Sequence, residues 1–288
     1  MDYPGNDRQP DAAPTPPADL GIFDRINNYL LLFYAAACLL MDYSLAGFFY
    51  YKKQIVLSLV VPGVLSILVP FFLLSRRSAF GFLREFRLTF PRLRTLAISV
   101  VLAGSAIIPI DAFSSIFQRK WPQDTDYISF ILSIKPKGPM SLVLVGIGIV
   151  LVAAVTEELL FRGFIQRIFE RNMGGPLAFV LAGVLFGLSH FNPPAFPGIA
   201  ALGILFGYIY YRTQNLWNSI FGHAIFNAVT LARLNAMTPE QVTSTAVESP
   251  PMKWVALSGA ILVASIWLLY RTNPGRPDGE TSVPPTGV

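Results

Sequence analysis

Residues 140–169 read MSLVLVGIGIVLVAAVTEELLFRGFIQRIF, a long apolar run that ends in a polar, charged turn. A helix over this run would be about 45 Å long, enough to cross a hydrocarbon core about 30 Å thick. Glu157 and Glu158 lie side by side within the run. A charged side chain in hydrocarbon costs from about 3 to over 10 kcal/mol, so acids in such a place are functional by default. The run therefore predicts a membrane-spanning helix that carries a functional site.

The composition of the whole chain also indicates a membrane protein. Of its 288 residues, 53% are hydrophobic and only 14% are charged, whereas a soluble domain has about a quarter charged residues. Because hydrocarbon offers no hydrogen bonds to the backbone, apolar spans must be helical. We therefore predict an all-α polytopic membrane helical bundle with about eight transmembrane helices and an intramembrane polar cavity open to the cytoplasm. The apolar segments lie at about 28–50, 54–74, 95–113, 140–169, 175–191, 197–212, 216–234 and 253–270.

The ends of the chain and its loops suggest the domain limits and the orientation. Residues 1–25 and 271–288 are rich in proline and polar residues, which predicts disordered tails around an integral membrane domain at 26–270, with a motif core at 140–234. Six arginines in the loop 75–94 place that loop in the cytoplasm. With eight spans, both termini would be cytoplasmic in a multi-pass protein of the cell membrane.

The charge and cysteine content exclude other classes of protein. The net charge is +5, and the arginines cluster in loops between apolar runs. We interpret them as topology signals and contacts with membrane lipids, and we expect no nucleic-acid partner. The single cysteine, Cys38, lies in an apolar run and cannot form an internal disulfide.

The acids of the fourth segment are expected to have different partners. Glu158 and Arg162 are four residues apart, so they can pair along one face of a helix. Glu157 is rotated about 100° from Glu158 and is free to face another partner.

Both histidines of the chain also lie in apolar segments. His190 closes the fifth segment, with Phe186 one turn before it, and His223 and Asn227 share a helix face in the seventh. Either histidine alone would be read as a packing residue bonded to a neighbouring helix. Together with the acid pair, however, these side chains predict a shared water-filled cavity.

Such a set of side chains could hydrolyse an amide without a covalent intermediate. A buried glutamate can act as a general base on water, and a histidine can orient that water. A histidine and an asparagine can donate N–H groups to a developing oxyanion. The G-x-S-x-G and H-E-x-x-H patterns are absent. We expect no cofactor, but Glu157, His190 and His223 could instead hold zinc.

Three short motifs resemble those of a known family. Glu157-Glu158-Leu-Leu-Phe-Arg162 matches EExxxR, Phe186-Gly-Leu-Ser-His190 matches FxxxH, and His223-Ala-Ile-Phe-Asn227 matches HxxxN. Their order is similar to that of the CPBP family of CAAX proteases and bacteriocin-processing enzymes, which includes the Rce1-type prenyl endopeptidases. The resemblance covers residues 157–227.

The resemblance implies a role for each residue of the motifs. It implies that Glu157 is the base, that His190 assists it, and that His223 and Asn227 form the oxyanion site. Glu158, Arg162 and Phe186 would support the site. The family contains processing enzymes, immunity proteins and scaffolds, so the resemblance implies no particular substrate.

Three classes of function remain open from the sequence. The leading hypothesis is an intramembrane endopeptidase that is independent of metal and acts on a membrane-associated or lipidated peptide or protein. The alternatives within the same fold are a zinc-dependent protease and a non-catalytic binding or immunity protein. A transporter or proton-coupled channel is disfavoured because the polar cluster lies only in the second half of the chain, without a matching repeat in the first.

Overall fold

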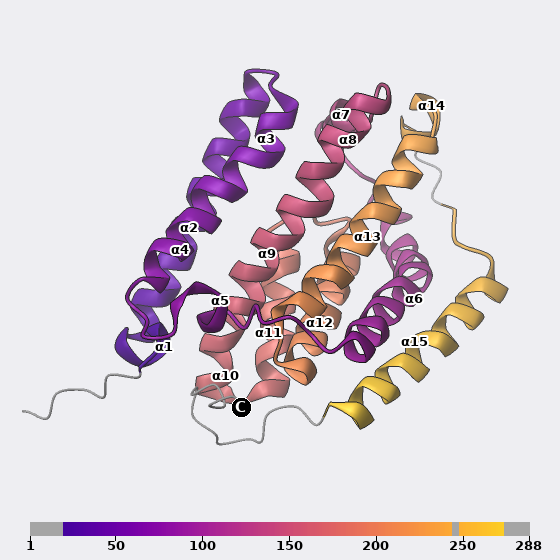
Figure 1. Cartoon of the computed structure of the whole chain (residues 1–288). Helices are drawn as coiled ribbons and strands as arrows, with labels where there is room; N and C mark the ends of the chain where they lie inside the picture. The colour runs from indigo at the N-terminus through magenta and orange to yellow at the C-terminus, as the bar shows by residue number, and fades with distance from the viewer. Residues whose placement is uncertain (1–19, 244–247, 274–288) are drawn as a thin grey trace, which may run out of the picture.

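The described residues, 20–243 and 248–273 of the computed structural model, fold into helices joined by turns (Figure 1). Each predicted apolar segment is helical. The helices are α2 (Asn28–Tyr51), α3 (Ile55–Pro62) with η1 (Gly63–Leu68) and α4 (Val69–Ser75), α6 (Leu93–Gln118), α8 (Pro139–Gly146) with η2 (Ile147–Ala153), α9 (Ala154–Leu160), η3 (Phe161–Gln166) and α10 (Arg167–Met173), α11 (Gly175–Leu188), α12 (Phe196–Thr213), α13 (Leu216–Ala236) and α15 (Met252–Thr272). Shorter helices are α1 (Ile22–Arg25), α5 (Gly81–Glu85), α7 (Thr125–Ile134) and α14 (Pro239–Thr243).

Five helical stretches among the described residues are long and apolar enough to span a membrane. They are Asn28–Tyr51, Ile55–Ser75, Leu93–Gln118, Pro139–Met173 and Met252–Thr272. Helix α11 has 14 residues and is therefore about 21 Å long, short of the hydrocarbon core. Helices α12 and α13 are longer but are not among the five. The all-α polytopic fold is thus confirmed, whereas the number of eight spans stays a prediction.

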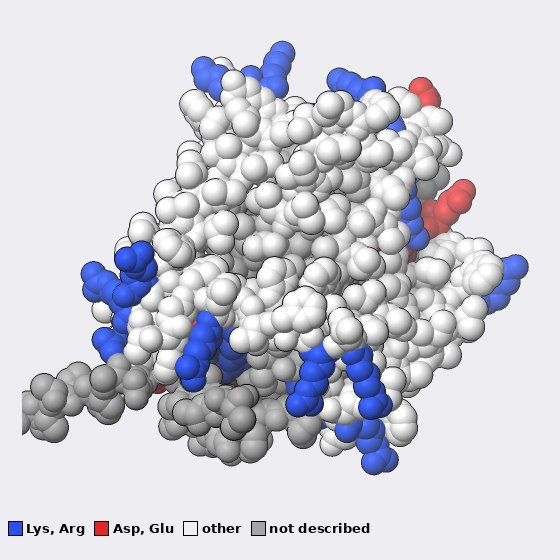
Figure 2. All heavy atoms as spheres, in the orientation of Figure 1, with Lys and Arg blue, Asp and Glu red and all other residues white. Residues whose placement is uncertain are grey.

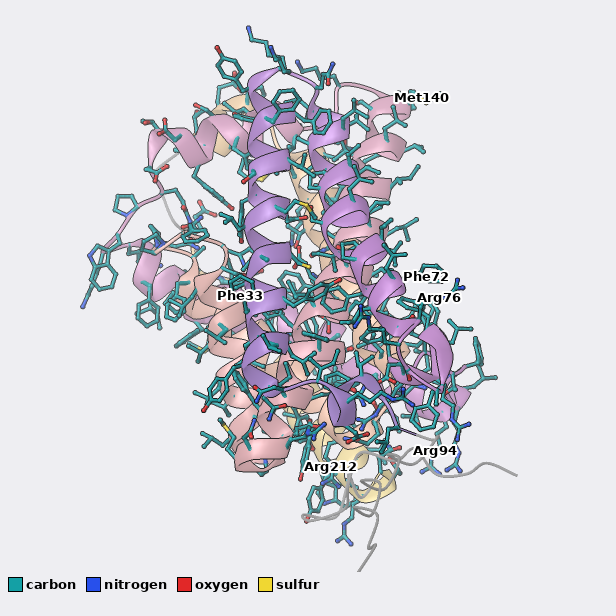
Figure 3. The ribbon with its side chains drawn as sticks, turned by 90° about the vertical axis from the view of Figure 1, so that its left-hand side faces the viewer. Phe33, Phe72, Arg76, Arg94, Met140 and Arg212 are labelled. Carbon is teal, nitrogen blue, oxygen red and sulfur yellow. The ribbon has the colours of Figure 1, made fainter. Side chains whose placement is uncertain are left out.

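The surface of the bundle has an apolar middle and charged ends. Figure 2 shows lysine and arginine side chains above and below a broad uncharged band. In Figure 3, Met140 lies near the upper end of the bundle and Arg94 and Arg212 near the lower end. Phe33, in the expanse between them, is 73% exposed. Large exposed apolar side chains over such a band are stable against lipid, so the band marks the part of the bundle that the membrane surrounds.

The two described ends of the chain lie at one end of the bundle. Helix α1 and the last turn of α15 are both at the end that carries α5, which belongs to the arginine-rich loop (Figure 1). Most of the two predicted tails lies outside the described residues. Within the first tail, however, Ile22 and Phe23 are buried in the helical turn α1, so the folded part begins before residue 26.

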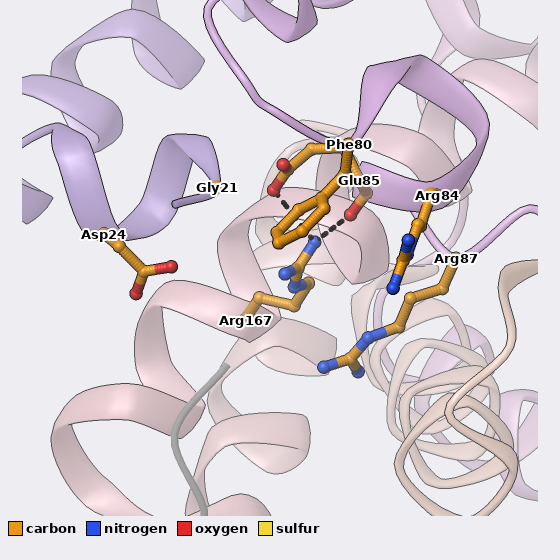
Figure 4. Close-up of a pocket in the computed structure, with 7 residues that line it drawn as sticks. All are labelled: Gly21, Asp24, Phe80, Arg84, Glu85, Arg87 and Arg167. Atoms are coloured by element: carbon orange, nitrogen blue, oxygen red, sulfur yellow. Dashed lines mark hydrogen bonds and ion pairs between the residues drawn. The ribbon is translucent and has the colours of Figure 1, made fainter. Parts of the chain in front are cut away.

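Helix α1 is held in place by a buried carboxylate of the loop (Figure 4). Glu85 is 2% exposed, and its Oε2 accepts hydrogen bonds from the Ile22 backbone N–H at 3.4 Å and from the Ser78 hydroxyl. Its Oε1 lies 3.8 Å from Nη1 of Arg167, which also donates to the Glu85 carbonyl oxygen. Arg167 belongs to α10. The arginine-rich loop and the N-terminal turn are therefore both tied to the helix that carries the motif acids.

Helices α11 and α12 pack closely through glycines. A Cβ added to Gly183 would lie 2.4 Å from the Ile204 backbone nitrogen and 2.7 Å from the Gly203 carbonyl carbon. A Cβ on Gly187 would lie 2.8 Å from the Ala200 Cβ. Gly183 and Gly187 are four residues apart, the spacing by which small residues bring membrane helices together. This contact brings the backbone of α12 close to the polar residues of the central helix.

We expect Gly183→Ala to destabilise the protein, because its methyl group would meet main-chain atoms that cannot move aside. Overpacking of this kind costs about 1–3 kcal/mol or more. Gly104→Ala, in α6, is the matched control, since a Cβ there has nothing within 4 Å. The measurement is thermal unfolding of both purified variants in detergent. Equal melting temperatures for the two variants would contradict the close contact.

Candidate active site

The helix that carries the acid pair changes its winding on both sides of that pair. Helix α9 holds Glu157 and Glu158, and the π-helical segments η2 and η3 flank it. Such segments are rare and are frequent at functional sites. On the adjacent stretch η1, Gly63 leaves room for α9, because a Cβ there would lie 2.9 Å from Oγ1 of Thr156. The two acids thus lie on a short α-helical stretch that π-helical segments flank and that packs closely against η1.

Glu158 and Arg162 form the predicted pair at the centre of the bundle. Arg162 Nη1 donates to Glu158 Oε1 at 2.8 Å, and both side chains are fully buried. Nη2 of Arg162 donates to the Gly203 carbonyl oxygen at 2.8 Å. The guanidinium also lies over the rings of Phe186 and Phe206, at 4.6 and 5.6 Å from their centroids. The pair therefore joins the central helix to α11 and α12.

His223 lies between the two glutamates. Its Nδ1 is 2.9 Å from Glu158 Oε1, and its Nε2 is 3.9 Å from Glu157 Oε2. A carboxylate only accepts hydrogen bonds, so Nδ1 carries a proton and donates it to Glu158. The residue is 4% exposed, and its ring stacks on that of Phe206 at 5.0 Å between centroids. Glu158 thus fixes the imidazole with Nε2 directed toward Glu157.

His190 lies in the turn after α11 and its side chain is exposed. Its Nδ1 is 2.7 Å from the Phe186 carbonyl oxygen, to which it donates, and its ring contacts that of Phe186 edge-on. No hydrogen bond or ion pair joins His190 to Glu157 in the described part of the chain. The structure therefore brings His223, and not His190, to the expected base.

Asn227 bonds to the central helix. Its Nδ2 donates to the Ile149 carbonyl oxygen at 2.9 Å, and Ile149 lies in η2. One of the two N–H groups of the amide that was expected to stabilise an oxyanion is thus engaged with a main-chain carbonyl. Together with the His223–Glu158 bond, this contact fixes α13 against the acid-bearing helix.

Glu157 faces a cavity of about 440 Å³. Its side chain is 30% exposed, whereas that of Glu158 is 0% exposed. The cavity extends from Glu157 to Tyr50 and Ser58, near the turn between α2 and α3. That turn is at the end of the bundle opposite α5 (Figure 1). A volume of this size is typical of ligand pockets. Because the cavity extends away from the arginine-rich loop, a cytoplasmic opening of the cavity and a cytoplasmic arginine-rich loop do not agree in this arrangement, and each stays a prediction.

Two residues of α2 near the site, Asp42 and Tyr43, were not predicted from the sequence to be functional. Asp42 and Tyr43 line the cavity together with Glu157. Tyr43 also donates a hydrogen bond to the Ser189 carbonyl oxygen, beside His190. Asp42 interrupts the first apolar segment, and that interruption was the signal available in the sequence, because an intramembrane acid is a functional candidate by default.

The possible metal ligands are only partly grouped. Among residues 20–243 and 248–273, no three or more histidine, cysteine, aspartate or glutamate side chains are arranged to hold a metal ion. Glu157 and His223 come together, but His190 is not beside them. In this arrangement the three residues of the zinc alternative do not form a ligand set.

The fold and the site define an all-α polytopic membrane protein with a cluster of titratable residues inside the bundle. Residues 139–229 match the family described as Type II CAAX prenyl endopeptidase Rce1-like. A protein of Bacillus subtilis (strain 168) named "Putative membrane peptidase YdiL" is 29% identical over 77 residues, which are 27% of this chain and 32% of the relative. The chain thus matches about a third of the length of that relative. No solved structure gives a significant match.

The family match contains all three motifs. It begins at the start of α8 and ends two residues after Asn227, so it includes the acid pair and both histidines. The resemblance found in the sequence is therefore confirmed for this segment, and the comparisons point to a membrane peptidase.

Asn227 offers a test that separates catalysis from packing. If its amide stabilises an oxyanion, Asn227→Ala should lower kcat by roughly 10–1000-fold and change KM less. Asn227→Asp should be worse, because a carboxylate repels both an oxyanion and the Ile149 carbonyl. The measurements are kcat per folded molecule and melting temperature, with Thr230→Ala on an exposed part of α13 as the control. A lower melting temperature with a normal kcat would leave Asn227 a packing role only.

Proposed function

We propose that the protein is an intramembrane endopeptidase that hydrolyses a peptide bond with water activated by Glu157. The observation that carries the proposal is the division of work between two adjacent acids. Glu158 is buried and bonded to Arg162 and His223, whereas Glu157 faces a cavity of about 440 Å³. The Rce1-like match of residues 139–229 supports peptide bonds as the substrate class.

In the proposed reaction, Glu157 removes a proton from a water molecule in the cavity, and the oxygen attacks the substrate carbonyl. Nε2 of His223 is directed toward Glu157, and Glu158 holds the other ring nitrogen. Because the ring is already oriented, no free energy is spent on reorienting it during the reaction. His190 keeps Nε2 available for the water. Asn227 would donate an amide N–H to the oxyanion in place of the Ile149 carbonyl oxygen.

The proposed substrate is a membrane-associated or lipidated peptide or protein. It would reach the cavity from the membrane, since large apolar side chains such as Phe33 and Leu40 are exposed along α2, which borders the cavity. We further propose that the arginine-rich end faces the cytoplasm of a cell membrane and contacts anionic lipid headgroups. The described ends of the chain lie at that same end, in keeping with two cytoplasmic termini.

We expect Glu157→Gln to lower turnover at least 100-fold, because it removes the general base and keeps the side-chain volume. The assay compares prenylated and unprenylated peptides of the same sequence, with the purified protein in detergent or vesicles. Glu240→Gln, in α14 and fully exposed, is the matched control for the change of acid to amide. Unchanged turnover in a folded Glu157→Gln variant would exclude Glu157 as the base. Binding of peptides without cleavage by the wild type would favour the non-catalytic alternative.

Metal dependence has a separate test. If Glu157 activates water directly, extended dialysis against a chelator should leave the rate of hydrolysis intact. The measurements are the metal content of the purified protein and its activity before and after dialysis. Stoichiometric zinc, with activity that is lost on removal and restored on addition, would establish the metal-dependent alternative instead.

A further inference from the structure

Asp42 is an acid in the middle of α2, a helix long and apolar enough to span the membrane. It lies outside the segment 139–229 that matches the family. Its Oδ1 is buried and has no hydrogen-bond partner among the described residues. The same cavity that Glu157 faces is lined by Asp42. An intramembrane carboxyl group that shares a cavity with a proposed catalytic base is a candidate for a functional role.

Among the described residues that line the cavity, two carry carboxyl groups and none carries a lysine or arginine side chain. The side chains around Asp42 and Glu157 are apolar, aromatic or hydroxyl-bearing, and neither lysine nor arginine is among them. Two negative charges in one cavity of low polarity disfavour each other. Two carboxyl groups in such a cavity can divide the roles of acid and base.

The neighbours of the two carboxyl groups differ. Glu157 has His223 at 3.9 Å, and behind that ring lies the buried Glu158–Arg162 pair. Asp42 has no such partner at Oδ1. We assign the base to Glu157, which lies beside a histidine of fixed orientation, and the acid to Asp42.

We propose that Asp42 is a second catalytic residue, a carboxylic acid that protonates the nitrogen of the leaving amine. The inference rests on the proposed peptidase function. It gives the reaction an acid and a base from two helices that face one cavity, α2 and α9.

The proposed steps balance with water as the only co-reactant. Glu157 takes one proton from water as the oxygen bonds to the substrate carbonyl carbon, which gives a tetrahedral intermediate. When the C–N bond breaks, Asp42 gives its proton to the departing nitrogen. The products are a carboxylic acid and an amine, Glu157 is then protonated and Asp42 is ionised. Transfer of the proton from Glu157 to Asp42 through the cavity restores the first state.

The test compares two substrates that differ in their need for an acid. The amine that leaves an amide must be protonated at its nitrogen. Nitrophenolate, the leaving group of an ester of the same peptide, departs without a proton. We expect Asp42→Asn to lower kcat for the amide about 100-fold or more, the scale of general acid catalysis, and to change ester hydrolysis less than about threefold. Glu157→Gln should lower both. Asp111→Asn, on α6 and paired with Arg233 away from the cavity, is the matched control.

Each outcome supports or contradicts the role of Asp42 as an acid. Equal loss of amide and ester hydrolysis in Asp42→Asn, measured per folded molecule, would overturn the acid role and leave a structural one. An unchanged amide rate would overturn it as well, while leaving the role of Glu157 intact. Asp42→Glu keeps the acid and should recover part of the amide rate if Asp42→Asn folds poorly, and no recovery would count against the proposal. A wild type that cleaves neither substrate would overturn the peptidase function itself, and this inference with it.

Discussion

The buried guanidinium of Arg162 is the interaction on which the rest of the structure depends. It bonds to Glu158 within its own helix and to the Gly203 carbonyl oxygen of α12, and it lies over an aromatic ring of α11. Glu158 in turn accepts from His223 on α13. Removing one member of such a set leaves an uncompensated buried charge, which typically costs 3–5 kcal/mol. Four helical segments are therefore placed by one ion pair.

This ion pair is possible only because the helices around it approach closely. Arg162 reaches a main-chain carbonyl, and Gln166, one turn later, reaches the Gly207 carbonyl oxygen at 3.1 Å. Side chains larger than hydrogen at Gly203 or Gly207 would meet atoms of the facing helix within about 3 Å. Backbone carbonyls here solvate charge that water cannot reach, and small residues give access to them.

The polar network has a fixed half and an open half. Glu158 and Arg162 are fully buried and hold His223 in one orientation. Glu157 and Asp42 line the cavity, where a substrate and water could enter. Because groups that are already oriented need no reorganisation during a reaction, the fixed half can support chemistry in the open half. Adjacent residues of one helix thus have different tasks, and the rotation of about 100° between them is the cause.

The sequence by itself determined the helical class, the apolar segments and the acid–arginine pair. These features depend on composition and on spacing within one helix, such as the four residues between Glu158 and Arg162. It also singled out both histidines, since polar residues are costly in hydrocarbon. The π-helical segments beside the acids were not foreseen, because their winding follows from packing against neighbours and leaves no periodic signal.

Only the tertiary structure decided which helices meet at the site. It placed His223 against both glutamates, turned His190 to the Phe186 carbonyl and engaged Asn227 with Ile149. It also brought α2, and with it Asp42, to the cavity of Glu157 across more than a hundred residues of sequence. Such meetings depend on how closely glycine-bearing helices pack and how they are rotated about their axes. No local pattern encodes these quantities, because they arise from the sum of contacts between distant segments.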